Sequence, residues 1–160
     1  MYDFSADPTL SKAENYASLC DAAAALVAGE TDRVANMANI AALLWDFLPH
    51  VNWTGFYRLI DDTLVLGPFQ GRPACIRIAI GEGVCGTAIS SKETQLVADV
   101  HAFPGHIACD ATTQSELVVP VWRSGVVCGV IDLDSPTKGR FDREDAAGIE
   151  KLARALDGFV

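Results

Sequence analysis

Apolar residues recur every three or four positions in the first part of the chain, which is the period of an amphipathic helix. One stripe consists of Tyr16, Leu19, Ala23 and Leu26. Ser11 and Glu14 precede it with the spacing of a capping box, and Gly29 follows it as a stop signal. A second helix is predicted to start at Thr31 and carries Val34, Met37, Ala41, Leu44 and Leu48 on one stripe. Pro49 ends it, so we predict two helices before residue 50, each with one face in the core.

After residue 50 the pattern changes to alternation with a period of two, which indicates half-buried strands. In the segment 51–60, which is rich in aromatic and β-branched residues, one face carries Trp53, Gly55, Tyr57 and Leu59. Asp61-Asp62 is a turn signal, and we predict a returning strand at 63–66 that ends where Gly67-Pro68 breaks the chain. A further strand is predicted at 75–80.

Glycines at positions 81, 83 and 86 mark a tight turn that leads into a short helix, predicted to end at about Ser91. Their spacing matches a dinucleotide-binding motif, but no long βαβ unit surrounds it and the helix is too short, so we reject that function. Cys85 falls near the start of this helix, where the helix dipole favours the thiolate form. A short strand is predicted at 95–97.

Two apolar runs, at 116–122 and 126–133, are joined by Ser124-Gly125 and predict a β-hairpin. Alternation places four residues on one face of its second strand, namely Cys128, Val130, Asp132 and Asp134. Pro120 inside the first run indicates an edge or bulged position. Asp142 then caps a last helix, whose stripe is Ile149, Leu152, Ala153 and Leu156. Strands bracketed by helices in this way are typical of an α+β fold with an antiparallel sheet.

Composition narrows the function classes. The chain has 160 residues, half of them hydrophobic, which suits one domain with a substantial core. Its formal net charge of −9 argues against nucleic acid and membrane as partners, because both bind basic surfaces. The apolar runs are too short to cross a bilayer, and the acidic N-terminus is unlike a secretory signal. Five cysteines leave one over after any pairing, so we expect reduced thiols and a cytoplasmic protein.

The segment 101–116 is a polar, turn-rich loop that holds Cys109 and ends at Glu116. A loop cysteine without a chemical role is one interpretation. The other is a redox centre, which needs a nucleophilic cysteine, a second cysteine to meet it and acids to handle protons. Cys75 and Cys85 offer the second thiol. A metal site is disfavoured, because neither the cysteines nor the histidines of this loop have the close pair spacing of structural zinc sites.

Three carboxylates lie at the ends of apolar strands rather than in charge runs, namely Glu116, Asp132 and Asp134. Solvation of the surface is the ordinary role of such residues, but hairpin geometry brings Glu116 within reach of Asp134. Acids packed together disfavour full ionisation, so one of them would keep its proton near neutral pH and protonate a departing oxygen. Trp53 and Tyr57 would form an aromatic wall for a small apolar group, although an ordinary place in the core explains them equally well.

Several short segments between residues 50 and 145 carry family signatures. They are Asn52-Trp-Thr-Gly-Phe-Tyr57, Gly83-Val-Cys-Gly-Thr-Ala88, Asp99-Val100, Phe103-Pro-Gly-His-Ile-Ala-Cys109, Ser115-Glu116 and Gly129-Val-Ile-Asp-Leu-Asp134. In these segments the chain resembles the GAF-domain free methionine-(R)-sulfoxide reductases. The glycine element is shared by GAF domains in general, whereas the three cysteines and the run that ends at Cys109 are more specific.

The resemblance implies an α+β, GAF-like fold with a six-stranded antiparallel sheet, helices packed on it, and a homodimer. It implies a single GAF domain over residues 1–160, with N-terminal helices in 1–49, the sheet and active-site loops in 50–135 and a C-terminal helix in 141–158. It also implies that the chain reduces free methionine-(R)-sulfoxide.

The resemblance assigns the catalytic thiol to Cys109 and the resolving thiol to Cys75 or Cys85, without choosing between them. It places five side chains around the substrate, namely Trp53, Tyr57, Glu116, Asp132 and Asp134. Within this set, Glu116 or Asp134 would protonate the sulfoxide oxygen, and the acids would hold the ammonium group.

In the implied reaction, Cys109 becomes a sulfenic acid and then part of an intramolecular disulfide, which thioredoxin reduces. No metal or other cofactor is required. The alternative is a GAF sensor module that binds a small ligand without catalysis. We expect the enzyme, because a sensor needs no cysteine trio and the chain shows no effector domain that would receive a signal.

Overall fold

The computed structural model describes residues 4–107 and 110–160. Its helices are α1 (Lys12–Val27), α2 (Arg33–Phe47), α3 (Gly83–Ser91), the 3-10 helix η1 (Val100–Ala102) and α4 (Arg143–Ala155). Its strands are β1 (Trp53–Ile60), β2 (Thr63–Gly71), β3 (Arg77–Ala79), β4 (Gln95–Val97), β5 (Ser115–Arg123) and β6 (Val126–Ser135).

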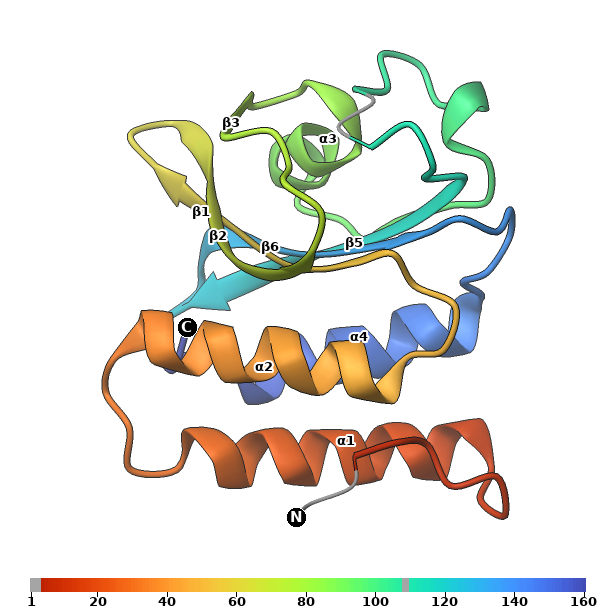
Figure 1. The fold of residues 1–160 in the computed structure, drawn as a ribbon. Coiled ribbons are helices and arrows are strands. Elements are labelled where there is room, and N and C mark those ends of the chain that lie inside the picture. Colours follow the sequence, from red (N-terminus) through yellow and green to blue (C-terminus); the bar gives the residue numbers. More distant parts are fainter. Residues whose placement is uncertain (1–3, 108–109) are drawn as a thin grey trace.

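The strands form one six-stranded sheet in the order β3-β2-β1-β6-β5-β4, and neighbouring strands are antiparallel. Helices α2 and α4 pack on one face of this sheet, and α1 packs on them as an outer layer (Figure 1). Helix α3 and the long loops cover the opposite face. The expected α+β fold with a six-stranded antiparallel sheet is thereby confirmed. No helix in the described part of the chain is long and apolar enough to span a bilayer.

Helices α1, α2 and α4 begin where a side chain satisfies their first amide groups. Ser11 and Glu14 form the predicted capping box at the start of α1. Asp32 accepts the amide of Ala35 at 2.9 Å, so α2 begins at Arg33 rather than at Thr31. One residue of the predicted α2 stripe is misplaced, because Val34 is 51% exposed. The inward face of α2 begins one turn later, at Met37.

The sheet separates two hydrophobic cores. The larger one lies between the sheet and the helices, and it includes Phe56 from β1 together with Leu117 and Ile131 from the hairpin. The smaller one lies between the sheet and α3, and it includes Trp53 and Tyr57. The predicted alternation along β1 is therefore correct, and it places the two large aromatic residues on the α3 side.

Strand β2 is longer than predicted. It continues through Gly67 and Pro68 to Gly71, although a break was expected there. The register shows that these two residues lie opposite the single residue Phe56, which is a β-bulge. A bulge accepts proline because the ladder hydrogen bonds are interrupted at that point. In contrast, β3 is shorter than the predicted 75–80 strand and is an edge of the sheet.

A second bulge moves Cys128 to the other face of β6. Val121 pairs with Gly129 and Trp122 pairs with Val127, so Cys128 is an extra residue without a partner. Its side chain packs against the helix-side core, whereas Val130 belongs to the α3-side core. The prediction that Cys128 shares a face with Val130, Asp132 and Asp134 is therefore wrong. Pro120 lies beyond the last β5 residue that pairs with β4, where that side of the strand is unpaired.

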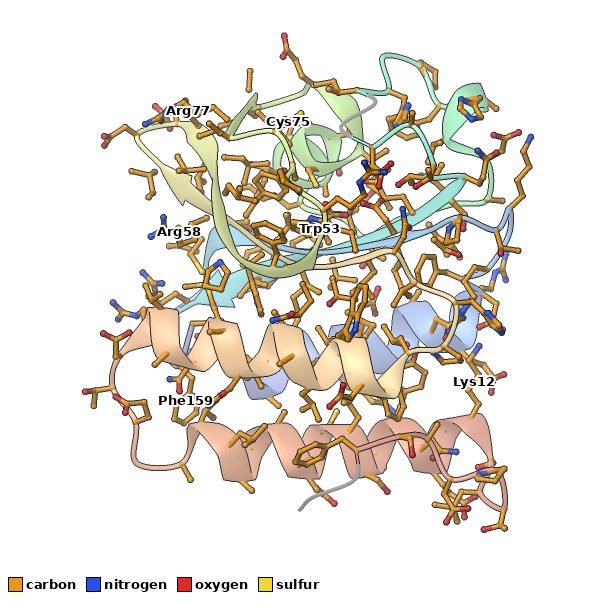
Figure 2. The ribbon with its side chains drawn as sticks, viewed as in Figure 1. Lys12, Trp53, Arg58, Cys75, Arg77 and Phe159 are labelled. Carbon is orange, nitrogen blue, oxygen red and sulfur yellow. The ribbon has the colours of Figure 1, made fainter. Side chains whose placement is uncertain are left out.

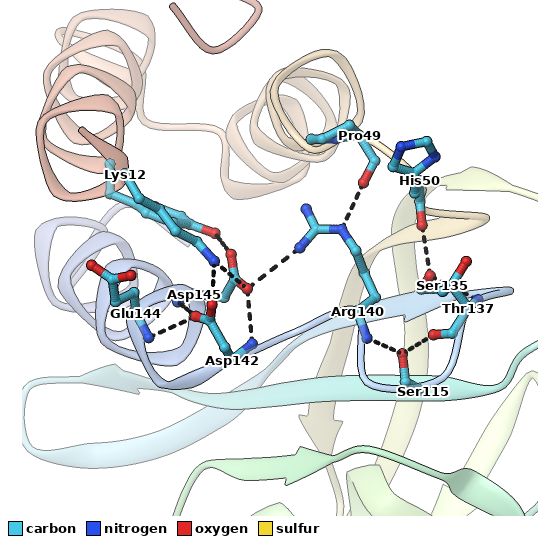
Figure 3. A network of polar contacts seen from close by, with 11 residues as sticks. Lys12, Pro49, His50, Ser115, Ser135, Thr137, Arg140, Asp142, Glu144 and Asp145 are labelled. Carbon is cyan, nitrogen blue, oxygen red and sulfur yellow. Dashed lines mark hydrogen bonds and ion pairs between the residues drawn. The ribbon is translucent and has the colours of Figure 1, made fainter. Parts of the chain in front are cut away.

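A buried carboxylate joins α1, α4 and the loop before α4 (Figure 3). Asp145 is 1% exposed and accepts a hydrogen bond from the Tyr16 hydroxyl at 2.7 Å. Lys12 Nζ and Arg140 Nη1 lie 2.8 and 3.4 Å from its Oδ2. The same oxygen accepts the amide of Asp142, which is the N-cap of α4. One side chain thus fixes the start of α4 and the docking of α1.

Candidate functional site

A small cavity lies on the α3 side of the sheet, where residues of β1, α3, β5 and β6 line it. Its volume is about 40 Å³. Predicted site residues that line it are Trp53, Tyr57, Cys85, Glu116, Asp132 and Asp134. The structure therefore brings together every predicted substrate-binding residue and one of the three cysteines. The proposed catalytic residue, Cys109, lies outside the described residues.

The three carboxylates meet because of the β5–β6 register. Glu116 pairs directly with Asp134, and Asp132 lies two residues before Asp134 on the same face of β6. Glu116 and Asp132 are buried, and Asp134 is partly exposed at the mouth of the cavity. Asp132 Oδ1 is buried and has no hydrogen-bond partner among the described residues.

Burial makes these acids hard to ionise. It raises the pKa of Glu116 well above its usual range, and the negative charges of Asp132 and Asp134 raise it further. Burial likewise raises the pKa of Asp132 to about 6. The pKa of Asp134 is raised well above its usual range by burial and by the charge of Asp132. The cluster therefore retains protons near neutral pH.

Cys85 is buried against the acids. Its thiol donates a long hydrogen bond of 4.0 Å to Glu116 Oε1. Burial raises the pKa of Cys85 well above that of a free thiol, and the charges of Asp132 and Glu116 act in the same direction. The expectation that the α3 dipole favours its thiolate is therefore wrong, because burial and nearby negative charge outweigh the dipole. Cys85 is a protonated thiol in this structure.

Cys75 differs from Cys85 in its bonding. Cys75 is disulfide-bonded, whereas Cys20, Cys85 and Cys128 carry free thiols. The carbonyl oxygen of Cys75 accepts a hydrogen bond of 2.9 Å from the Tyr57 hydroxyl. That bond connects the segment before β3 to the floor of the cavity.

The aromatic wall is a stack of three rings. Trp53 stacks on Phe69 with ring centroids 5.1 Å apart, and on Tyr57 with centroids 5.9 Å apart. The indole N–H donates to the carbonyl of Arg72 at 3.1 Å. These contacts hold the Trp53 and Tyr57 rings as rigid sides of the cavity.

The sequence reasoning missed a polar connection behind the acids. The Asn52 amide donates to Asp110 Oδ2, Thr112 Oγ1 and Thr113 Oγ1 at 3.1 to 3.3 Å. Asp110 and Thr113 also line the cavity. The turn itself had a sequence signal, because aspartate is a common first residue of Asx turns. In the structure Asp110 accepts the amide of Thr112, two residues further on, as in such a turn. The partner, Asn52, was too distant in sequence to be predicted.

One group in the described chain has metal-ligand geometry. Ligand atoms of Cys85, Glu116 and Asp132 lie within 4.8 Å of one another. Two carboxylates with one thiol and no histidine differ from the usual zinc ligand sets, and Cys85 and Glu116 hold their protons strongly. That the chain works without a metal stays a prediction.

Comparisons with known proteins agree on the family. The model of the GAF domain matches residues 35–156. The free methionine-R-sulfoxide reductase of Escherichia coli is 51% identical over 148 residues, which are 92% of this chain and 90% of that protein.

Two solved structures extend this finding. A Neisseria meningitidis free methionine-R-sulfoxide reductase in complex with its substrate has a TM-score of 0.89 and 44% identity over 94% of this chain and 91% of that chain. A Burkholderia vietnamiensis protein with the provisional description of a GAF sensor has a TM-score of 0.88 and 55% identity over 92% and 94%. The chain thus belongs to the GAF-domain family, in the group that contains the free methionine-R-sulfoxide reductases.

Proposed function

We propose that this protein reduces free methionine-(R)-sulfoxide to methionine. The observation that carries the proposal is the cluster of three carboxylates with raised pKa values that faces an aromatic wall in one cavity. A relative with half of its residues identical to this chain has this activity in its name. The acidic cluster suits a substrate that brings an ammonium group and an oxygen that needs a proton.

Each part of the substrate has a complementary partner in the cavity. An ammonium group offers donors and positive charge to Asp132 and Asp134, which would lower their pKa values once it binds. The methyl group on sulfur would lie against the Trp53 ring. A free amino acid needs more room than about 40 Å³, so we propose that the lining from His106 and Ile107 moves outward on binding.

The chemical step uses a proton from the cluster. The Cys109 thiolate attacks the sulfoxide sulfur while Glu116, or Asp134, protonates the oxygen. The hydroxyl group then transfers from the substrate sulfur to the Cys109 sulfur. The sulfur–oxygen bond of the substrate and the transient bond between the two sulfurs both break, methionine leaves, and Cys109 becomes a sulfenic acid. The substrate sulfur gains two electrons and the cysteine sulfur loses two.

Recycling needs a second thiol and an external dithiol. We propose Cys75 as the resolving residue, because it is the disulfide-bonded cysteine whereas Cys85 keeps a free and strongly protonated thiol. The Cys75 thiol condenses with the sulfenic acid, and water leaves. Thioredoxin then reduces the disulfide by thiol exchange. We further propose that the chain acts as a cytoplasmic homodimer, which sedimentation of the purified protein would test.

The deciding experiment follows methionine release from the free R epimer, the free S epimer and a peptide-bound R sulfoxide, each with an excess of dithiol. We expect the wild-type protein to release methionine from the free R epimer. The Cys109→Ser variant should release none. Glu116→Gln should slow single-turnover release, whereas Glu93→Gln at an exposed position should not. Equal rates for all three substrates, or an active Cys109→Ser variant, would overturn the proposal.

A further inference from the structure

A second cavity, of about 300 Å³, lies on the helix side of the sheet. It is bounded by the start of α2, by parts of β1, β5 and β6, and by Val160. Phe56 and Tyr57, neighbours along β1, both border it, although the Tyr57 side chain packs in the opposite core. The sheet therefore separates this cavity from the candidate active site. Figure 2 shows Arg58 at the end of the molecule where α2 begins.

Three arginines converge on an otherwise apolar lining. Arg33 is the first residue of α2, Arg58 belongs to β1, and Arg123 is the last residue of β5. The remaining wall is largely hydrophobic and includes Met37, Phe56, Val121 and Val130. None of the three guanidinium groups has an Asp or Glu carboxylate within 4.0 Å in residues 4–107 and 110–160. Three arginines gathered at one cavity are unusual in a chain whose net charge is −9.

The hydrogen bonds of these arginines are incomplete. Arg58 Nε is buried and has no partner among the described residues, and Arg58 Nη2 lies 3.5 Å from the carbonyl oxygen of Leu66. A buried donor without an acceptor is destabilising, so an acceptor in the cavity would be favourable. Arg123 donates twice to the main-chain oxygen of Val160, at 3.2 and 2.7 Å, which holds its guanidinium at the cavity wall.

The pKa of Cys128, a thiol in the cavity, is affected by the charges of the nearby arginines. Cys128 lines the cavity because its bulge turns the side chain toward the helices. Burial raises the pKa of Cys128, while the charges of Arg123 and Arg33 act to lower it. Asp157, which accepts the amide of Ser124, acts to raise it. Both guanidinium groups therefore lie within electrostatic range of one point in the cavity.

We propose that this cavity is a binding site for a small organic anion, a carboxylate joined to an apolar body. The carboxylate would accept from the Arg58 and Arg33 guanidinium groups, which have free donors and match its geometry. The body would contact Met37 and Phe56. The proposal uses none of the residues of the candidate active site, so it stands independently of the reductase function.

The first test compares two alkylating reagents that differ in charge. Iodoacetate and iodoacetamide modify thiols alike, and mass spectrometry of the Cys128 peptide gives their relative rates. We expect the iodoacetate to iodoacetamide ratio at Cys128 to fall about fivefold in Arg58→Gln and in Arg33→Gln, as nearby charges imply. Arg77→Gln removes the same charge from exposed β3 and should leave the ratio unchanged. A ratio that is the same in all four proteins would overturn the site.

The second test asks what kind of anion binds. Benzoate should protect Cys128 from iodoacetamide in the wild-type protein, whereas benzamide, which has the same shape without the charge, should not. Arg33→Gln, a change at an exposed position that does not threaten folding, should abolish the protection. Equal protection by inorganic phosphate would overturn the assignment to an organic anion, and protection by benzamide would overturn the role of the arginines.

Discussion

At the scale of single residues, the cross-strand pair Glu116 and Asp134 dominates the chemistry of the candidate site. Like charges directly opposite each other in an antiparallel pair are destabilising, and burial here strengthens the repulsion. The fold tolerates the pair because protons neutralise it. Cys85 shares this environment, which explains why a thiol near a helix start is not activated.

The acid cluster should make the protein less stable as pH rises. The pKa of Asp132 is about 6 in the folded protein against 3.8 ordinarily, so the folded state binds the proton more tightly. This group's contribution to the free energy of unfolding is therefore greatest below pH 4 and is lost as pH rises through about 6. Asp132→Asn mimics the protonated acid. Its free energy of unfolding should exceed that of wild type by on the order of 2–3 kcal/mol at pH 8 and match it at pH 4.

Urea unfolding at several pH values measures this difference. Asp46→Asn removes an exposed carboxylate from α2 and should follow the wild-type curve throughout. If Asp132→Asn were less stable than wild type at pH 8, the carboxylate would be held ionised by partners that we have not identified.

The two upstream cysteines should behave differently on mutation. In Cys75→Ser we expect one methionine released per subunit and then no cycling with thioredoxin, because the sulfenic acid has no partner. Cys85→Ser should still cycle, since the Cys85 thiol is buried and strongly protonated. Counting methionine in single-turnover and thioredoxin-coupled assays separates the two roles. Loss of cycling in Cys85→Ser alone would assign the resolving role to the other cysteine.

At the scale of elements, close backbone approach decides how the helices pack. Gly148 lies on the inward face of α4, where a Cβ atom would come within 2.2 Å of the Tyr16 ring of α1. Gly86 in α3 has the same role toward β3, because a Cβ atom there would lie 2.4 Å from the Ala79 carbonyl oxygen. Both glycines therefore set how near a helix lies to its neighbour.

Gly148→Ala should destabilise the fold even though alanine favours helices. The new methyl group must displace the Tyr16 ring and strain its hydrogen bond to Asp145. Overpacking of this kind costs roughly 1–3 kcal/mol, which outweighs the helix propensity gained. Lys151→Ala on the exposed face of the same helix should change the free energy of unfolding by about 0.5 kcal/mol or less. Thermal or urea unfolding of both variants distinguishes the two effects, and a neutral Gly148→Ala would contradict this packing.

At the scale of the whole molecule, the sheet, the inner helices α2 and α4, and the outer helix α1 have to be held in position relative to one another. The outer helix α1 packs on α2 and α4 rather than on the sheet. Its position therefore depends on the inner helices and on the Asp145 network, which joins α1 to the start of α4 (Figure 3). The candidate site lies on the far side of the sheet from this network.

Asp145→Asn should weaken the fold far more than loss of a surface ion pair. It leaves the half-buried Arg140 without its counter-charge and leaves Lys12 with Asp142 alone, at a cost of roughly 3 kcal/mol. Asp99→Asn breaks the exposed pair with Lys138 and should cost about 0–1 kcal/mol. Urea unfolding compares the two, and equal effects would show that the buried network contributes no more than a surface pair.

The periodicity of the sequence was sufficient for the order of elements, for the capping box at Ser11 and for the shared face of Trp53 and Tyr57. These features depend on neighbours within a few residues, so local propensity and alternation determine them. The shared face of Asp132 and Asp134 follows in the same way. Family motifs added the expectation of a GAF fold, which the comparisons confirmed.

Tertiary structure alone decided what depends on distant partners. Cys128 changed face because a bulge is set by the register with β5, and β2 continued through Pro68 because β1 accommodates a bulge there. Cys85 became a protonated thiol because packing buries it beside Asp132 and Glu116, and Glu116 is 31 positions away in sequence. Likewise, no local pattern brings Arg33, Arg58 and Arg123 to one cavity. Alternation is a local property of the chain, whereas register, burial and electrostatic environment arise only when remote segments pack together.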